Sequence, residues 1–193
     1  MKYSTLILFA IILITSCGKN VELNDREKIL LLIVQQSAKD SKTSEAPTIS
    51  TGTKYDLIEV LADDTSQLYV RSQWLRSSEN NALRDAKLPA AFSVYEPLLT
   101  TTKQYAGEET IDLENVEKHL KGKPRITHEA APPEQLMGKV FISYVAIDEA
   151  NGRALAYILR SGKTSEGRGG LMLFERNGES TWLLREQIEM EVF

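Results

Sequence analysis

The chain has 193 residues, a formal net charge of -4 at pH 7, one cysteine and two histidines. An acidic balance gives no general attraction to nucleic acid, so nucleic acid is excluded as a partner. The cysteine and histidine counts leave little material for a disulfide, a histidine-based metal site or a catalytic triad. We therefore expect no metal and no other cofactor.

The amino-terminal segment has the pattern of a secretory leader. Lys2 supplies one positive charge, and an uncharged run of about nine residues extends from Leu6 to Ile14. This run has the length of a signal-peptide core and falls far short of the ~20 apolar residues that a permanent membrane-spanning helix needs. Residues 1–16 are therefore predicted to be a signal peptide.

The segment Ile14-Thr15-Ser16-Cys17 ends in the only cysteine of the chain. It resembles the lipobox of bacterial lipoproteins, in which an aliphatic residue, a small residue and a Gly, Ala or Ser precede the lipidated cysteine. The resemblance implies cleavage after Ser16, acylation of the Cys17 thiol with fatty acids such as palmitate, and acylation of the new amino terminus. The alternatives are an uncleaved single-pass helix or a secretory signal that leaves a free thiol.

Lipidation would decide where the protein works. One acyl chain binds a membrane only reversibly, since each buried methylene contributes ~0.8 kcal/mol, whereas two or more chains bind stably. The resemblance thus implies a lipid anchor in the cell envelope. Gly18, and not aspartate, follows the cysteine, which in enteric-type lipoproteins implies the outer membrane of a Gram-negative bacterium.

The length of the chain that remains after the leader predicts a short tether, residues 17–24, and one globular domain, residues 25–193. Asn24 and Glu27 form a variant of the capping box ahead of the apolar run Ile29 to Val34, which predicts that a helix begins here. A helix lying on the membrane is the alternative, but its polar face lacks the expected lysines and arginines, so packing in the core is favoured.

The polar stretch 37–53 has Ile49 as its only large apolar residue, and it is predicted to be a mobile loop because it could bury little surface. Two apolar-rich runs, Tyr55 to Leu61 and Gln67 to Leu75, flank a turn-like cluster and predict a hairpin. The pair Asp63-Asp64 within that cluster is interpreted as a solvated turn and not as a metal site.

Three helical segments are predicted next. Asn80 to Lys87 is expected to form a short helix ended by Pro89, and Ala91 to Thr100 a helical segment interrupted by Pro97. The third, Thr110 to Leu120, is expected to be a surface helix. Its buried stripe is Leu113, Val116 and Leu120, and His119 is interpreted as a cation at its end.

The carboxyl-terminal quarter has the clearest strand pattern. Short turns, two of them Asn-Gly pairs, separate four strand-like segments, which are residues 140–147, 153–160, 170–176 and 181–193. They predict a four-stranded antiparallel meander, and such a sheet needs a covering layer on its apolar face. We expect an α+β fold in which helices from the amino-terminal half supply that layer.

The order of features from Phe141 to Trp182 is a strand, a Gly-rich loop, an apolar strand, an Asn-Gly turn and a strand that begins with tryptophan. This region is similar to the carboxyl-terminal region of a loose group of uncharacterised small Gram-negative lipoproteins. Members often carry cysteines in the Gly-rich loop, and this chain has none there. The resemblance implies no activity.

The Gly-rich loop, residues 161–170, contains Gly162-Lys163-Thr164, which imitates the end of a phosphate-binding loop. That motif needs a glycine where Tyr157 stands and a helix directly afterwards, which the following glycines disfavour. A nucleotide site is therefore excluded. The alternative role for this loop is contact with a partner through Lys163, Glu166 and Arg168, since loops on rigid sheets commonly carry contacts.

No compact catalytic motif is present, because no serine lies in Gly-x-Ser-x-Gly and the cysteine is assigned to lipid. The carboxylate pairs Glu108-Glu109 and Glu189-Glu191 are interpreted as solvated charge. Two functions remain. The favoured one is a non-enzymatic module that binds an envelope protein or an incoming effector through a sheet edge or the loops, and the alternative is an envelope hydrolase acting on cell-wall or lipid material.

Overall fold

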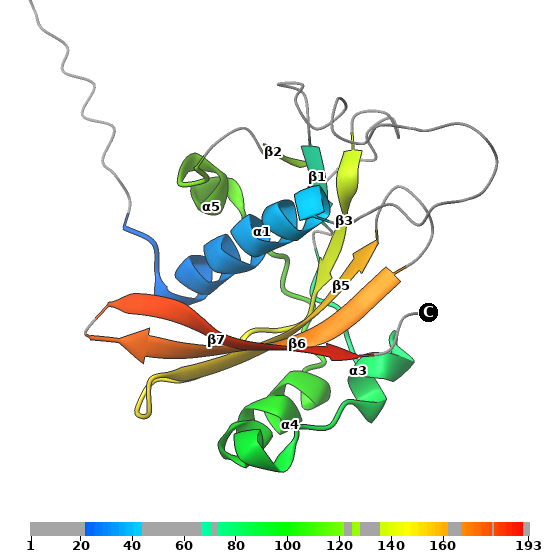
Figure 1. Ribbon diagram of the computed structural model, residues 1–193, viewed down its shortest axis with the longest axis vertical. Coiled ribbons are helices and arrows are strands. Elements are labelled where there is room, and N and C mark those ends of the chain that lie inside the picture. Colours follow the sequence, from blue (N-terminus) through cyan, green and yellow to red (C-terminus); the bar gives the residue numbers. More distant parts are fainter. Residues whose placement is uncertain are drawn as a thin grey trace, which may run out of the picture.

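The computed structural model describes residues 22–43, 67–70, 73–121, 125–127, 136–161, 167–178 and 180–190. The fold is α+β, as predicted, with helices mainly in the first half and strands mainly in the second (Figure 1). The elements in chain order are α1 (Asp25–Thr43), β1 (Gln67–Val70), α3 (Asn81–Asp85), η1 (Ala90–Tyr95), α4 (Glu96–Gln104), α5 (Glu114–Lys118), β2 (Arg125–Thr127), β3 (Leu136–Ile142), β4 (Ala146–Asp148), β5 (Arg153–Ser161), β6 (Gly167–Asn177) and β7 (Thr181–Met190).

One sheet forms the centre of the fold, with strand order β2-β1-β3-β5-β6-β7 and β4 paired to β5. Strands β3, β5, β6 and β7 are joined by antiparallel pairing, which confirms the predicted meander. Strands β1 and β2 extend this sheet with parallel pairing. Within the described residues β1 is therefore a parallel neighbour of β3, while the predicted hairpin partner Tyr55 to Leu61 lies outside them.

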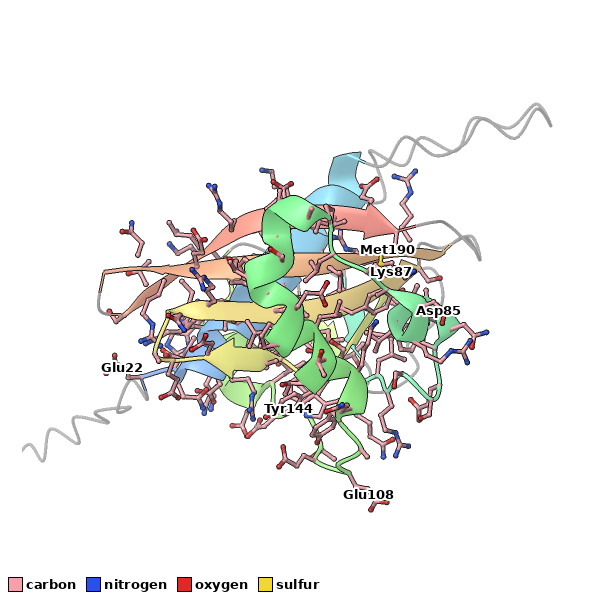
Figure 2. All side chains as sticks on the ribbon, turned by 90° about the horizontal axis from the view of Figure 1, so that it is seen from below. Glu22, Asp85, Lys87, Glu108, Tyr144 and Met190 are labelled. Carbon is pink, nitrogen blue, oxygen red and sulfur yellow. The ribbon has the colours of Figure 1, made fainter. Side chains whose placement is uncertain are left out.

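The sheet is covered on both faces, whereas the sequence pattern predicted a single apolar face. Helix α1 crosses one face, and α3, η1 and α4 lie against the other (Figures 1 and 2). The reason is visible in β5 and β6, where Ala154 to Ile158 and Leu171 to Phe174 are buried without alternation. Strands that are apolar on successive residues need a layer on each side.

The start of α1 confirms the predicted capping box. Glu27 donates its backbone N–H to Asn24 Oδ1 at 2.9 Å, and Asn24 donates its backbone N–H to Glu27 Oε2 at 2.7 Å. Ile29 and Val34 are fully buried in the core beside the sheet. Core packing of this helix, and not an exposed membrane-lying role, follows from that burial.

Helix α1 continues to Thr43, so the prediction that a loop begins at residue 37 is wrong. Ser37 and Ala38 are buried, and they extend the packed face of the helix by another turn despite the polar composition that follows. Residues 44–53 of the predicted loop lie outside the described residues.

The helices that cover the other face agree in part with those predicted from the sequence. Asn80 caps α3 by accepting the Leu83 backbone N–H at 2.8 Å, and the helix ends before Pro89 as predicted. Pro97 does not interrupt a helix, because it lies in the first turn of α4, where the missing N–H has no helical partner to lose.

Tyr95 connects η1 to the sheet. Its hydroxyl lies 3.3 Å from the Phe174 carbonyl oxygen and 3.2 Å from Glu175 Oε1. Burial raises the pKa of Tyr95 to about 12, and the negative charge of Glu175 adds to that shift. The hydroxyl is therefore neutral at physiological pH and available as a hydrogen-bond donor.

Helix α5 is shorter than the predicted helix Thr110 to Leu120, because it spans only Glu114–Lys118. Thr110 instead forms an isolated antiparallel bridge with Gln73, so it is not part of the helix. Leu113 and Val116 are buried as predicted.

The two Asn-Gly turns place only their glycines in the left-handed region, with φ of 60° at Gly152 and 72° at Gly178. Asn151 and Asn177 do not adopt positive φ. Asn151 is held by Asp148, whose carboxylate accepts its backbone N–H at 3.1 Å and its side-chain amide at 2.7 Å. The turn from Asp148 to Gly152 is therefore longer than a two-residue hairpin turn and has one left-handed residue, Gly152.

Part of the predicted Gly-rich loop is strand, since β6 begins at Gly167. A Cβ at Gly169 would overlap the Tyr157 hydroxyl, and one at Gly170 would lie 2.6 Å from the Ile188 carbonyl oxygen. These glycines are required by close packing across the sheet. The Tyr157 hydroxyl is buried without a hydrogen-bond partner among the described residues, and burial raises its pKa.

We predict that Gly169→Ala lowers the free energy of unfolding by about 1–3 kcal/mol through overpacking. Tyr157→Phe removes an unpartnered buried hydroxyl and should raise that free energy by about 1 kcal/mol. In the background of the Tyr157→Phe substitution, Gly169→Ala should cost less, because the overlapping oxygen is absent. Denaturant unfolding of the four proteins in a double-mutant cycle measures this coupling, and an equal cost in both backgrounds would contradict the contact.

Candidate functional site

The residues predicted to carry function lie mostly outside the described residues. This applies to Cys17 and the lipobox, and to Lys163 and Glu166 of the Gly-rich loop. Arg168 is described and lies in β6, directly opposite Arg160 of β5. The predicted contact surface therefore lies mostly outside the described residues and stays a prediction.

A sheet edge was the other predicted binding surface, and the edge formed by β7 has features that discourage strand addition. The register of β7 shifts between Glu186 and Leu184, so Arg185 has no residue opposite it in β6. This bulge directs Trp182 toward the α1 face and Ile188 toward the α4 face. A bulge and exposed charges on an edge strand oppose pairing with another chain.

A cleft lies between the segment that follows β1 and the loop that joins α4 to α5. Its volume is about 270 Å³. In Figure 2, Glu108 projects at the same end of the molecule as Tyr144. The acidic cleft, as we name it, is lined by Gln73, Trp74, Arg76, Gly107, Glu108 and Glu109.

Backbone contacts fix one wall of the acidic cleft. Gln73 bridges Thr110, which ties the wall to the loop opposite. Leu75 bridges Ser143 in parallel and donates its backbone N–H to the Ile142 carbonyl oxygen at 2.7 Å. The segment between them, which carries Trp74, is thus held by the sheet on one side and by the loop on the other.

Three aromatic rings pack behind the cleft, and we refer to Trp74, Tyr105 and Tyr144 as the aromatic cluster. Tyr144 stacks on Tyr105 with ring centroids 4.2 Å apart and 8° between planes. Trp74 meets Tyr144 edge to face at 5.9 Å. Arg26 lies 4.7 Å from the centre of the Tyr144 ring and donates from Nη2 to its hydroxyl at 2.7 Å. The cluster therefore connects the cleft to the first turn of α1.

The loop of the cleft follows this cluster closely. A Cβ at Gly107 would lie 2.5 Å from the Tyr105 hydroxyl oxygen, and the ring cannot easily retreat because it stacks on Tyr144. Burial raises the pKa of Tyr105, and the negative charge of Glu109 raises it further, while the Glu109 backbone opposes that shift. Gly107 thus lets the loop pass over the ring.

The charge of the acidic cleft is negative. Arg76 forms an ion pair with Glu79, with 2.9 Å between Nη2 and Oε1, so its charge is balanced. Glu108 and Glu109 are exposed, and neither forms an ion pair within the described residues. Trp74 is only 5% exposed, and its indole N–H has no hydrogen-bond acceptor in the described part of the chain. The site therefore offers negative charge at its rim, whereas the Trp74 indole nitrogen is buried and is not exposed to the cleft.

Other candidate groups have structural contacts. His119 caps the end of α5, and its Nδ1 lies 2.8 Å from the Asn115 carbonyl oxygen, so this nitrogen donates to the helix backbone. Among the residues whose positions are described, no group of three or more His, Cys, Asp or Glu is placed to hold a metal ion. No helix in the described ranges is long and apolar enough to cross a membrane.

The sequence did not reveal the acidic cleft. Glu108 and Glu109 were interpreted as solvated charge, and their exposure agrees with that. The missing information was the long-range bridge between Gln73 and Thr110, which no local pattern encodes. The nearest available signal was Gly107, because a glycine directly before two acids and shortly after an aromatic residue can mark a close approach of backbone.

Comparison of the chain with protein-family models, with curated proteins and with solved structures found no match. The function must therefore be argued from the residues and their arrangement.

Proposed function

We propose that this chain is a lipid-anchored lipoprotein of the bacterial cell envelope, and that its folded domain is a non-enzymatic binding module. The observation that carries the proposal is the series Ile14-Thr15-Ser16-Cys17 directly after an uncharged apolar run. The anchor would be the acylated Cys17, and the partner an envelope protein or another ligand presented there. The outer membrane is the proposed location, because Gly18 follows the cysteine.

The start of α1 supports a domain held close to its anchor. Asp25 forms an ion pair with Arg176, and Arg26 binds the Tyr144 hydroxyl, so the first helical turn is fixed to the sheet. Eight residue steps separate Cys17 from Asp25, and an extended chain of that length spans at most about 28 Å. An anchored domain would thus keep the α1 start, and with it the aromatic cluster, near the membrane.

The described side chains support binding better than catalysis. Glu108 and Glu109 are consecutive and exposed in one loop, whereas the usual hydrolysis of a glycosidic bond needs two carboxyl groups that flank that bond. His119, the described histidine, donates to the backbone of its own helix.

The anchor is tested by mass spectrometry and fatty-acid labelling of the protein from its native envelope. We expect a chain that begins at Cys17 and carries acyl groups on its thiol and amino terminus, and we expect Cys17→Ala to lose label and membrane association. Ser16→Ala is the matched control, since alanine is accepted at that lipobox position and should leave processing intact. An unmodified thiol or a retained leader would refute the anchor.

The binding role is tested separately by cross-linking in intact envelopes followed by purification of the tagged chain. We expect a protein partner in near-stoichiometric amount, and its recovery should fall when Cys17→Ala removes the domain from the membrane. Absence of any such partner, together with turnover of a cell-wall or lipid substrate by the purified protein, would instead favour the hydrolase.

A further inference from the structure

We propose that Asn177 is a site of spontaneous covalent modification, at which the side-chain amide is lost and the residue becomes aspartate or isoaspartate. The inference depends neither on the lipid anchor nor on the binding role of the domain. It is carried by a difference between the two Asn-Gly turns, Asn151-Gly152 and Asn177-Gly178, which share the same residue pair and a left-handed glycine. The structure restrains the first asparagine and leaves the second unrestrained.

The reaction needs water and no other reagent. The Gly178 backbone nitrogen loses its proton and forms a bond to Asn177 Cγ, which closes a succinimide ring. The bond between Cγ and the side-chain nitrogen breaks, and that nitrogen takes up a proton and leaves as ammonia. Water then opens the ring at the side-chain carbonyl to give aspartate, or at the main-chain carbonyl to give isoaspartate. Glycine favours the first step because it has no side chain to obstruct the attack.

Asn177 stands at the end of β6, where it pairs with Thr181 and closes the β6–β7 hairpin. Its side chain is exposed and forms no hydrogen bond within the described residues. A Cβ built on Gly178 would have no atom within 4 Å, so the space beside the attacking nitrogen is open. The amide can therefore rotate toward the Gly178 nitrogen without losing a contact, and water can reach the ring that forms.

Asn151 is held in place by several hydrogen bonds. Its side-chain amide donates to Asp148 Oδ2 at 2.7 Å, and its backbone N–H donates to Asp148 Oδ1 at 3.1 Å. The Gly152 N–H, which would be the attacking group, donates to the Glu149 carbonyl oxygen at 3.4 Å, while the Gly152 carbonyl oxygen accepts the Arg176 N–H at 2.8 Å. Ring closure at this turn would have to break these bonds, so Asn151 is protected.

Modification would weaken the hairpin that Asn177 closes. Both products add a negative charge, and isoaspartate also routes the main chain through Cβ, which lengthens the backbone by one methylene where β6 meets the turn. The Asn177–Thr181 pair would then lose its register. The adjacent Arg176 binds Asp25 of α1, so the disturbance begins next to the contact that holds the first turn of α1.

Peptide mapping by mass spectrometry tests the proposal on the full chain in dodecyl maltoside, incubated at growth temperature in mildly alkaline buffer. The two asparagines fall in different tryptic peptides, because Arg153 and Arg176 lie between them. Asn177 should deamidate at least ~10-fold faster than Asn151, since a hydrogen bond to a charged carboxylate must break only at Asn151. Equal rates, or a faster reaction at Asn151, would overturn the proposal.

The same chain unfolded in urea is the control for intrinsic reactivity. Both Asn-Gly pairs should then deamidate at comparable rates, because the contacts that distinguish them are lost on unfolding. If Asn177 reacted in urea but not in the folded chain, the hairpin would be protective and the proposal would be refuted.

Asp148→Ala tests the cause of the difference. It removes the acceptor that holds Asn151, so deamidation of Asn151 should become at least ~10-fold faster, while the rate at Asn177 stays unchanged. Glu149→Ala is the matched control, because it removes a neighbouring exposed acid and keeps the backbone carbonyl. An Asn151 rate that did not change in Asp148→Ala, or that rose equally in both variants, would contradict the assigned protection.

Asn177→Gln tests the consequence for stability, because glutamine would have to close a larger ring and therefore reacts far more slowly. During incubation the urea midpoint of the unmodified sequence should fall, whereas that of Asn177→Gln should stay constant. An equal fall in both proteins would place the damage elsewhere and contradict the role assigned to Asn177.

Discussion

The fold depends on the attachment of the first turn of α1 to the break between β3 and β4. Arg26 contacts Tyr144 both across its ring and at its hydroxyl, and Tyr144 lies in that break, between Ile142 and Ala146. The same ring stacks on Tyr105 and receives the edge of Trp74. A single side chain thereby joins the helix over one face, the central sheet and the loop that forms the acidic cleft.

An ion pair adds to the contact between Arg26 and the Tyr144 ring in holding the first turn of α1 to the sheet. Arg176 of β6 pairs with Asp25 and lies 4.8 Å from the ring centre of Trp182 in β7. The first turn of α1 is therefore held by the Arg26–Tyr144 pair, by the Asp25–Arg176 ion pair and by its own capping box. Because the proposed lipid tether would lead directly into this turn, a rigid connection here would transmit the position of the anchor to the cleft and would limit how the domain can rotate at the membrane.

The sequence predicted features that are set by neighbours along the chain. The capping box at Asn24 and Glu27 involves residues three apart, and the strands of the meander are joined by short turns, so local patterns were sufficient. The extension of α1 beyond Ser37 was missed because burial against the sheet outweighs the polar composition of that segment. The position of Pro97 was missed because proline is tolerated in the first turn of a helix, where no backbone hydrogen bond is lost. The parallel pairing of β1 with β2 and β3, and the bridge from Gln73 to Thr110, join distant segments, and no periodicity encodes such pairings.

The central claim is that the Tyr144 ring couples α1 to the loop of the acidic cleft. Amide hydrogen exchange of Tyr144→Ala, compared with Tyr144→Phe, tests it most directly. Tyr144→Ala should speed amide exchange both in residues 26–34 and in residues 105–110, and it should lower the free energy of unfolding by about 2–3 kcal/mol. Tyr144→Phe keeps the stack and should change exchange chiefly near Arg26. If Tyr144→Ala altered only its own strand and left both distant segments protected, the claim would be contradicted.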